Sequence, residues 1–237
     1  TPGVSNSGNR IFNFQVTADY ARSFGNHDVA ATLVYHQRET INNVPSAEQN
    51  VILPYREQGL AGRVTYRYDS RYLFEANFGY NGSENFYAKN RWGFFPSVAV
   101  GWVISNEPFF YKAKDVVSLL KLRASYGLVG NDALPMRFAY LTLVNMNSDD
   151  NEFKGFFGGD SFNIYKGIQI TRWGNEDATW EISRKLNIGL EIGLFNDLTI
   201  MADAFYEKRD DIFMLRRSIP ASSGFQESTP YANIGAV

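Results

Sequence analysis

Apolar and polar residues alternate along most of the chain, and alternation with a period of two predicts β-strands. In the segment 72–81, one face would be apolar and the other would carry Glu75, Asn77 and Asn81. The same pattern recurs at 12–20, 29–38, 60–68, 94–104, 120–128, 182–192 and 198–207. We therefore predict eight strands, with helical turns expected only near 107–114.

The connections between these strands alternate in length. Short or modest connections lie at 24–27, 69–71, 105–118 and 195–197, and long ones lie at 39–58, 82–92, 130–178 and 208–237. This order predicts antiparallel, up-and-down strands with turns at one end and long loops at the other. Outer-membrane β-barrels sort their connections in this way. Soluble sandwiches with Greek-key crossings do not usually do so.

Aromatic residues predict where such strands would meet the membrane boundaries. Tyr72 and Tyr80 are separated by about 26 Å along a strand, which is about 20 Å of depth at a tilt of about 40°. Pro96 falls on the same apolar face near the outer end, where the loss of one ladder donor costs least or a bulge is expected. We expect two aromatic girdles, formed by Tyr72, Tyr80, Trp92, Trp102, Tyr126, Trp180 and Tyr206.

Composition favours surfaces that are half apolar and excludes several classes of protein. Aromatic residues make up 16% and hydrophobic residues 44% of the chain, yet the mean hydropathy is only −0.29. A run of about 18 apolar residues is missing from the sequence, which excludes a membrane-spanning helix. With 0 Cys there is no disulfide framework or thiol catalysis, and a net charge of −2 gives no basic excess for nucleic acid.

Alternation and aromatic content also describe a soluble β-sandwich whose apolar face is its core. Such a domain could act as a carbohydrate-binding module, and this alternative stays open on pattern alone. The order of the connections and the two girdles favour the membrane barrel. A β-scaffold enzyme such as a glycoside hydrolase ranks third, because no acid–base pair stands at a defensible position.

Catalytic and metal-binding chemistry has little support in the sequence. The acidic pairs at 149–150 and 210–211 fall in expected outer loops, where solvated carboxylates are the simpler interpretation. His27 and His36 have no partner at a zinc-ligand spacing. The segments 156–162 and 222–224 match neither a phosphate-binding loop nor a nucleophile elbow. We predict no enzyme, no metal and no cofactor.

The long segment 130–178 is the candidate binding region. Aromatic rings can stack on the C–H faces of sugars while neighbouring amides bond to hydroxyl groups. The simpler alternative is that these rings pack the loop or meet a capping partner. The candidate substrate-binding residues are Phe138, Tyr140, Phe156, Phe157 and Trp173. On the polar face, charged side chains are expected to line a wet lumen or meet a plug: Arg63, Arg67, Arg123 and Lys185.

Four segments resemble a known family. The segments 72–110, with its RWG, FPS and GW motifs, and 119–131, with SYG and GN, are similar to the SusC/RagA family of TonB-dependent outer-membrane transporters. The segments 179–213 and 222–237 match the same family in the same order. One departure is Asn81, where the family usually has Asp before Gly-Ser, and this puts any metal or substrate role for that hairpin in doubt.

The resemblance implies a 22-stranded barrel of the bacterial outer membrane in Bacteroidetes, filled by an N-terminal plug. It also implies energy from TonB, a SusD-like surface lipoprotein as partner, and glycan oligomers or peptides as substrates. The 237 residues would supply about eight strands from the C-terminal half of that barrel. On this interpretation, residues 1–237 are a partial barrel that lacks the plug domain and the final strands, and it needs the remainder of the barrel and outer-membrane lipid for stability.

Overall fold

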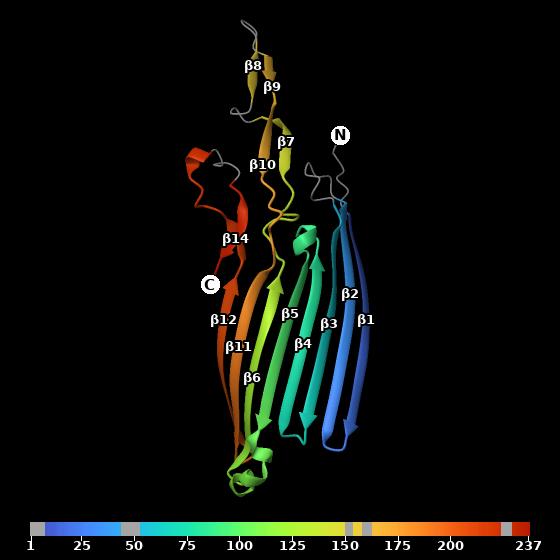
Figure 1. Cartoon of the computed structure of the whole chain (residues 1–237), viewed down its shortest axis with the longest axis vertical. Coiled ribbons are helices and arrows are strands. Elements are labelled where there is room, and N and C mark those ends of the chain that lie inside the picture. The colour runs from blue at the N-terminus through green and yellow to red at the C-terminus, as the bar shows by residue number, and fades with distance from the viewer. Residues whose placement is uncertain (1–7, 44–52, 150–153, 158–162, 224–228) are drawn as a thin grey trace, which may run out of the picture.

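The computed structural model describes residues 8–43, 53–149, 154–157, 163–223 and 229–237. Most of them form one eight-stranded antiparallel sheet (Figure 1). Its strands, in spatial order, are β1 (Gly8–Phe24), β2 (His27–Asn43), β3 (Tyr55–Tyr68), β4 (Tyr72–Ser83), β5 (Trp92–Val103), β6 (Val117–Asn131), β11 (Glu181–Leu194) and β12 (Leu198–Asp210).

The sheet confirms the predicted antiparallel, up-and-down arrangement. Each inner strand of the sheet pairs with the sheet strand before it and the one after it, so the spatial order follows the chain order. The two outermost strands, β1 and β12, are not paired to each other, and the sheet is an open arc rather than a closed barrel. Both edges therefore present backbone groups that a further strand could pair with.

All four short or modest connections lie at the lower end of the sheet in Figure 1. Two of them are tight turns with two consecutive residues in the left-handed region, where φ is 49° and 53° at Asp69 and Ser70 and 55° and 60° at Phe195 and Asn196. Such turns match the twist of antiparallel strands. The β5–β6 connection contains two 3₁₀ helices, η2 (Ile104–Asn106) and η3 (Pro108–Ala113). Only η3 falls in the range 107–114 where the sequence predicted helical turns.

The long connections lie at the opposite end and contain small elements that the sequence did not predict (Figure 1). They comprise η1 (Ala88–Asn90), η4 (Ala221–Ser223) and three two-stranded sheets. The paired strands of these sheets are β7 (Leu143–Ser148) with β10 (Gly167–Arg172), β8 (Gly155–Phe157) with β9 (Asn163–Tyr165), and β13 (Ile212–Leu215) with β14 (Tyr231–Gly235).

Pro96 marks the place where β5 and β6 separate. It lies opposite Phe78 of β4 on the apolar face, as predicted, while the pairing of β5 with β6 begins one residue later at Ser97. Beyond this point the ring of Phe95 occupies the gap. A Cβ atom on residue 130 would overlap the Phe95 ring. The ring therefore fits beside β6 only because residue 130 is glycine.

The buried hydrophobic cluster lies at the loop end of the molecule rather than within the sheet. It contains Phe86, Ala139, Ala178, Trp180 and Phe213, with Phe95 packed against it. Trp180 is 7% exposed, and its ring lies 5.2 Å, between centroids, from each of Phe86 and Phe95. This corrects the expected position of Trp180 in an outward-facing girdle, because its indole closes the core where β5 and β6 part.

Candidate functional site

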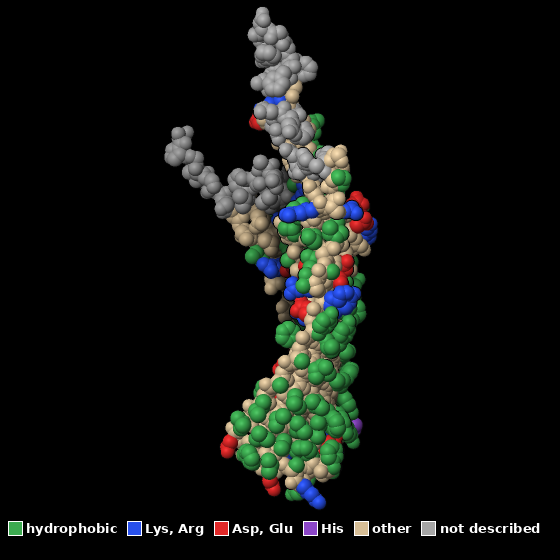
Figure 2. Space-filling view, turned by 90° about the vertical axis from the view of Figure 1, so that its left-hand side faces the viewer, with side chains coloured by type: hydrophobic (Ala, Val, Ile, Leu, Met, Phe, Trp, Pro, Cys, Tyr) green, Lys and Arg blue, Asp and Glu red, His purple; other side chains and the backbone are tan. Residues whose placement is uncertain are grey.

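One face of the sheet is apolar across all eight strands. The register places a single row of residues on this face, from Tyr20 through Ala31, Val64, Ala76, Val98, Tyr126 and Leu186 to Tyr206. The side chains stay exposed, with 44% of Phe74, 54% of Val100 and 53% of Ile188 accessible. In Figure 2 hydrophobic side chains cover the lower part of the molecule, and most charged side chains lie above them. A continuous apolar surface of this kind marks contact with a membrane or partner.

Aromatic rings stand near both limits of this apolar face. Near the turns, Tyr68 and Tyr72 stack with centroids 6.3 Å apart, and Trp102 lies opposite Tyr72. Near the loops, Tyr80 and Trp92 stack at 4.8 Å. Six of the seven expected girdle residues are exposed on this face: Tyr72, Tyr80, Trp92, Trp102, Tyr126 and Tyr206. A membrane-boundary role for these six stays a prediction.

The opposite face of the sheet carries charges that pair across neighbouring strands. The four predicted residues each meet a carboxylate: Arg63 Nη2 lies 2.6 Å from Glu75, Arg67 Nη2 2.7 Å from Asp28, Arg123 Nη2 2.7 Å from Asp203, and Lys185 Nζ 3.8 Å from Glu207. These exposed pairs add little stability one by one. Asp28, Arg67, Glu75 and Arg123 line a groove of about 600 Å³ on this face.

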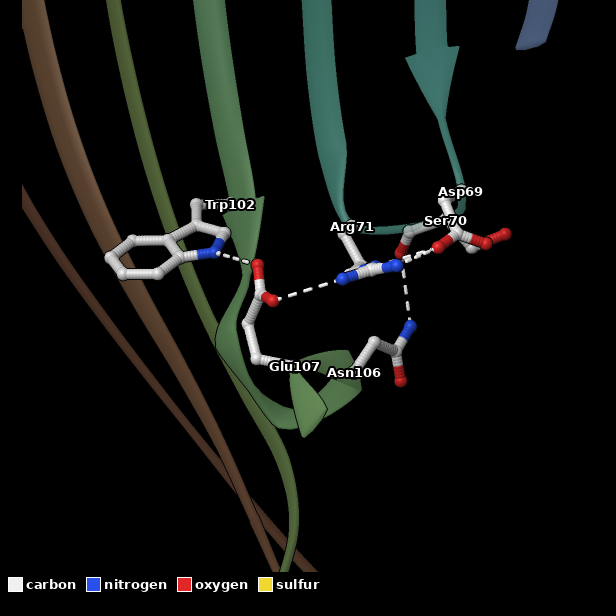
Figure 3. A network of polar contacts seen from close by, with 6 residues as sticks. All are labelled: Asp69, Ser70, Arg71, Trp102, Asn106 and Glu107. Atoms are coloured by element: carbon white, nitrogen blue, oxygen red, sulfur yellow. Dashed lines mark hydrogen bonds and ion pairs between the residues drawn. The ribbon is translucent and has the colours of Figure 1, made fainter. Parts of the chain in front are cut away.

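A polar network joins two connections at the turn end, and the sequence analysis missed it (Figure 3). The Glu107 carboxylate accepts a hydrogen bond of 3.0 Å from the Trp102 indole and one of 3.1 Å from Arg71 Nη1. Arg71 also pairs with Asp69, and the Asn106 amide donates to the Ser70 carbonyl at 2.9 Å. The signal in the sequence was an acid placed directly before Pro108, five residues after a strand-end tryptophan.

Glu107 is the main buried charge of this network, with 7% of its side chain exposed. Hydrogen bonds from the Tyr72 hydroxyl, the Trp102 indole and the Arg71 guanidinium hold the pKa of the Glu107 carboxyl below its ordinary value. Hydrogen bonds to Asp69 and Glu107 raise the pKa of Arg71. Both residues are therefore charged at neutral pH, and the network clamps the β3–β4 turn to the β5–β6 connection.

The predicted substrate-binding residues do not form one cluster. Phe138 is 4% exposed and lies edge-on to Tyr140, with ring centroids 6.1 Å apart. Trp173 is 37% exposed and follows β10. Phe156 and Phe157 belong to β8, in the separate β8–β9 hairpin (Figure 1). A substrate role for these five residues stays a prediction. The burial of Phe138 favours a packing role for this residue.

Several acidic and histidine residues considered as catalytic or metal-binding candidates form ion pairs or hydrogen bonds with neighbouring side chains. Asp210 pairs with Arg184 and Lys208, Asp149 lies 2.9 Å from Lys166, and Asp150 lies outside the described residues. His27 Nδ1 lies 2.7 Å from the Tyr66 hydroxyl. Within the described ranges, no three His, Cys, Asp or Glu side chains gather as metal ligands would. Nor does any helix in this part of the chain have the length and apolarity to cross a membrane.

An exposed apolar face, a charged opposite face and an open antiparallel arc define a piece of a transmembrane β-barrel wall. The family model described as "TonB dependent receptor-like, beta-barrel" matches residues 2–237, and the chain belongs to this family of outer-membrane proteins. Within it the chain is SusC/RagA-like, as its sequence similarity to SusC indicates. The resemblance noted in the sequence is thereby confirmed.

Two curated relatives illustrate the similarity. The chain is 33% identical over 203 residues to "TonB-dependent receptor SusC" of Bacteroides thetaiotaomicron, covering 85% of this chain and 19% of that protein. It is also 33% identical over 204 residues to "TonB-dependent receptor P39" of Formosa agariphila, covering 84% of this chain and 18% of that protein. The chain thus spans about a fifth of the length of these relatives.

Solved structures share the fold. The "RagAB peptide importer in the 'closed-closed' state" superimposes with a TM-score of 0.74 at 24% identity, over 97% of this chain and 26% of that one. The siderophore receptor PirA from Pseudomonas aeruginosa superimposes with a TM-score of 0.59 at 11% identity, over 97% of this chain and 38% of that one. At these identities the likeness concerns the fold alone.

Proposed function

We propose that the chain is an arc of the barrel wall of a TonB-dependent importer that takes up glycan or peptide oligomers. The observation that carries the proposal is the division of one sheet into an exposed apolar face and a face of paired charges. A lipid-facing surface must be apolar, whereas a lumen tolerates charge. A soluble β-sandwich, in contrast, would bury the apolar face of its sheet.

The remainder of the barrel and a plug are the partners that this arrangement calls for. The unpaired edges at β1 and β12 would each receive a further strand of the barrel. Arg67, Glu75 and Arg123 line a groove on the charged face, and this groove would meet the plug. Energy would come from TonB through the plug, so the wall itself needs no catalytic residue and no cofactor.

The loop end would meet the substrate and a SusD-like lipoprotein. The peptide class is supported by a structural neighbour that is named a peptide importer, and the glycan class by the resemblance to the SusC/RagA family. Phe138, Tyr140 and Trp173 lie in the long connection between β6 and β11, with Phe156 and Phe157 in its outer hairpin. We assign this connection to contact with oligomers or with the lipoprotein lid.

Membrane fractionation and uptake test the proposal. The protein with its natural flanking sequence should be extracted only from outer membranes and only with detergent. Cells should accumulate a labelled oligosaccharide or oligopeptide, and deletion of TonB should abolish that accumulation. Recovery of the protein in the soluble fraction would refute the barrel, and uptake that persists without TonB would refute the importer.

A further inference from the structure

A small pocket lies on the apolar face at its loop end, outside the charged lining. Four of its residues form one register row across β2 to β5, namely Gln37, Gln58, Gly82 and Trp92. The pocket has a volume of about 140 Å³, below the 300–1,000 Å³ typical of drug-sized ligand sites. It suits a single sugar-sized group rather than an oligomer.

The depth of this row places the pocket at the membrane boundary. Tyr72 and Gly82 lie on one strand, ten residues apart, which is about 33 Å along the strand and about 25 Å of depth at a tilt of about 40°. That depth equals the height of the apolar band of outer-membrane barrels. The row lies directly beyond the exposed Tyr80, on which Trp92 stacks. It therefore lies level with lipid headgroups.

Among the charged side chains that line the pocket, Arg91 is the cation without a carboxylate partner in the described residues. Of its two carboxylates, Glu84 lies 3.9 Å from Arg56 Nη1, and Glu57 lies 3.6 Å from Arg38 of β2. Arg56 is further held by Glu39 at 2.8 Å. Arg91 also lines the pocket, and it forms no ion pair with a carboxylate of the described residues. Arg91 is thus the side chain placed to meet an added anion.

The neutral groups fit a sugar. The carboxamides of Gln37 and Gln58 both lie 3.5 Å from the Tyr35 hydroxyl, and amides of this kind can donate to and accept from sugar hydroxyls. The Trp92 ring lies over Gly82, where an added Cβ would come within 3.1 Å of it. The glycine thus lets the indole lie flat and form one wall of the pocket.

We propose that this pocket binds the phosphorylated sugar headgroup of a lipid in the outer leaflet. Arg91 would donate to the phosphate through charge-assisted hydrogen bonds, while Gln37 and Gln58 bond to the sugar. A nutrient moving through the barrel would not meet Gln37, Gln58 or Trp92, because these side chains lie on the face opposite Arg63 and Arg123; of the lining residues within the sheet, only Glu57 belongs to the charged face. The site would anchor the rim of the barrel to its own membrane.

Lipid binding to the full-length protein tests this proposal by native mass spectrometry in a mild detergent. The probe is lipid A, whose headgroup is a phosphorylated glucosamine disaccharide, and phosphatidylglycerol serves as an anionic lipid without a sugar. Arg91→Ala should raise the Kd for lipid A about tenfold, since it removes charge-assisted hydrogen bonds. Gln58→Ala should raise it several-fold and remains informative if the Arg91 variant fails to fold. Arg63→Ala is the matched control, because Arg63 lies on the same strand as Gln58 but faces the other side of the sheet, pairs with Glu75 and does not line the pocket.

Wild-type affinity for lipid A in both pocket variants would overturn the proposal, and so would an equal loss in Arg63→Ala. Equal binding of phosphatidylglycerol, with the same dependence on Arg91, would show that the sugar is not recognised. Full competition by soluble glucosamine 1-phosphate at equal concentration would show that a free metabolite, not a lipid, is the ligand. Uptake measured in parallel separates this result from the importer proposal, because a lost lipid site leaves the transport path intact.

Discussion

The indole of Trp102 donates a 3.0 Å hydrogen bond to the carboxylate of Glu107, across the point where β5 ends and the connection to β6 begins. The same carboxylate receives Arg71, which belongs to the preceding turn. A single acid therefore fixes two consecutive connections at one end of the sheet (Figure 3).

Replacing Glu107 with Gln should lower the melting temperature of the detergent-purified protein by a few degrees. The amide keeps the shape of the side chain, but it loses the ion pair with Arg71 and two charge-assisted hydrogen bonds. Asp197→Asn is the control, because it removes an acid from another connection at the same end. Equal shifts in the two variants would contradict a special role for Glu107.

The contribution of Glu107 should depend on pH. Its pKa is lower in the folded protein than its ordinary value of 4.5, so the unfolded chain takes up a proton first. The stabilisation is therefore complete above about pH 4.5 and is lost as the pH falls through the lower folded-state pKa. Melting temperatures of wild type and Glu107→Gln should differ at pH 7 and converge in acid. A difference that stays constant down to pH 3 would contradict this.

An arginine should be tolerated on one face of β5 and rejected on the other. Val98 faces the apolar side and Ala99 the charged side, although they are adjacent in sequence. Val98→Arg should destabilise the protein by about 2–4 kcal/mol in a bilayer if the site is near the midplane, because a lipid-facing charge is poorly solvated. Ala99→Arg should cost far less. Folding equilibria in lipid vesicles measure both, and equal costs would argue against a lipid-facing surface.

Gly130→Ala should disrupt the junction between β5 and β6. Its methyl group would overlap the Phe95 ring, and overpacking of this kind costs about 1–3 kcal/mol. Phe95→Leu should recover part of that loss when combined with Gly130→Ala, since it removes the obstructing ring. A double-mutant cycle of thermal stability measures this coupling. Simple additivity would mean that the two residues do not contact each other.

The eight long strands could be predicted from sequence because each must keep one apolar and one polar face. Their ends were harder to predict: β1 runs over Gly8–Phe24 where alternation indicated 12–20. The small strands β7 to β10 are too short and too irregular to show a clear period. Within the candidate site, the partners of Arg63 and Arg123 depend on register, which a sequence pattern does not contain.

Trp180 shows why the loop-end core escaped prediction. Its position two residues before Ile182 suggested the apolar face of a strand, but β11 begins at Glu181 and the indole turns into the gap above Pro96. Only the separation of β5 from β6 creates that gap. Glu107 escaped for a related reason, since one of its donors, Arg71, comes from another turn.

The order of the strands also bears on how the wall assembles. Neighbouring strands are mostly neighbours in the chain, so hairpins can zip together one after another. The pair β6–β11 is the exception, because residues 132–180 must first be looped out. Loop-closure entropy grows with that length, although only by about 0.6 kcal/mol per doubling. We expect this seam to close late, with the burial of Trp180 locking it once β11 has docked.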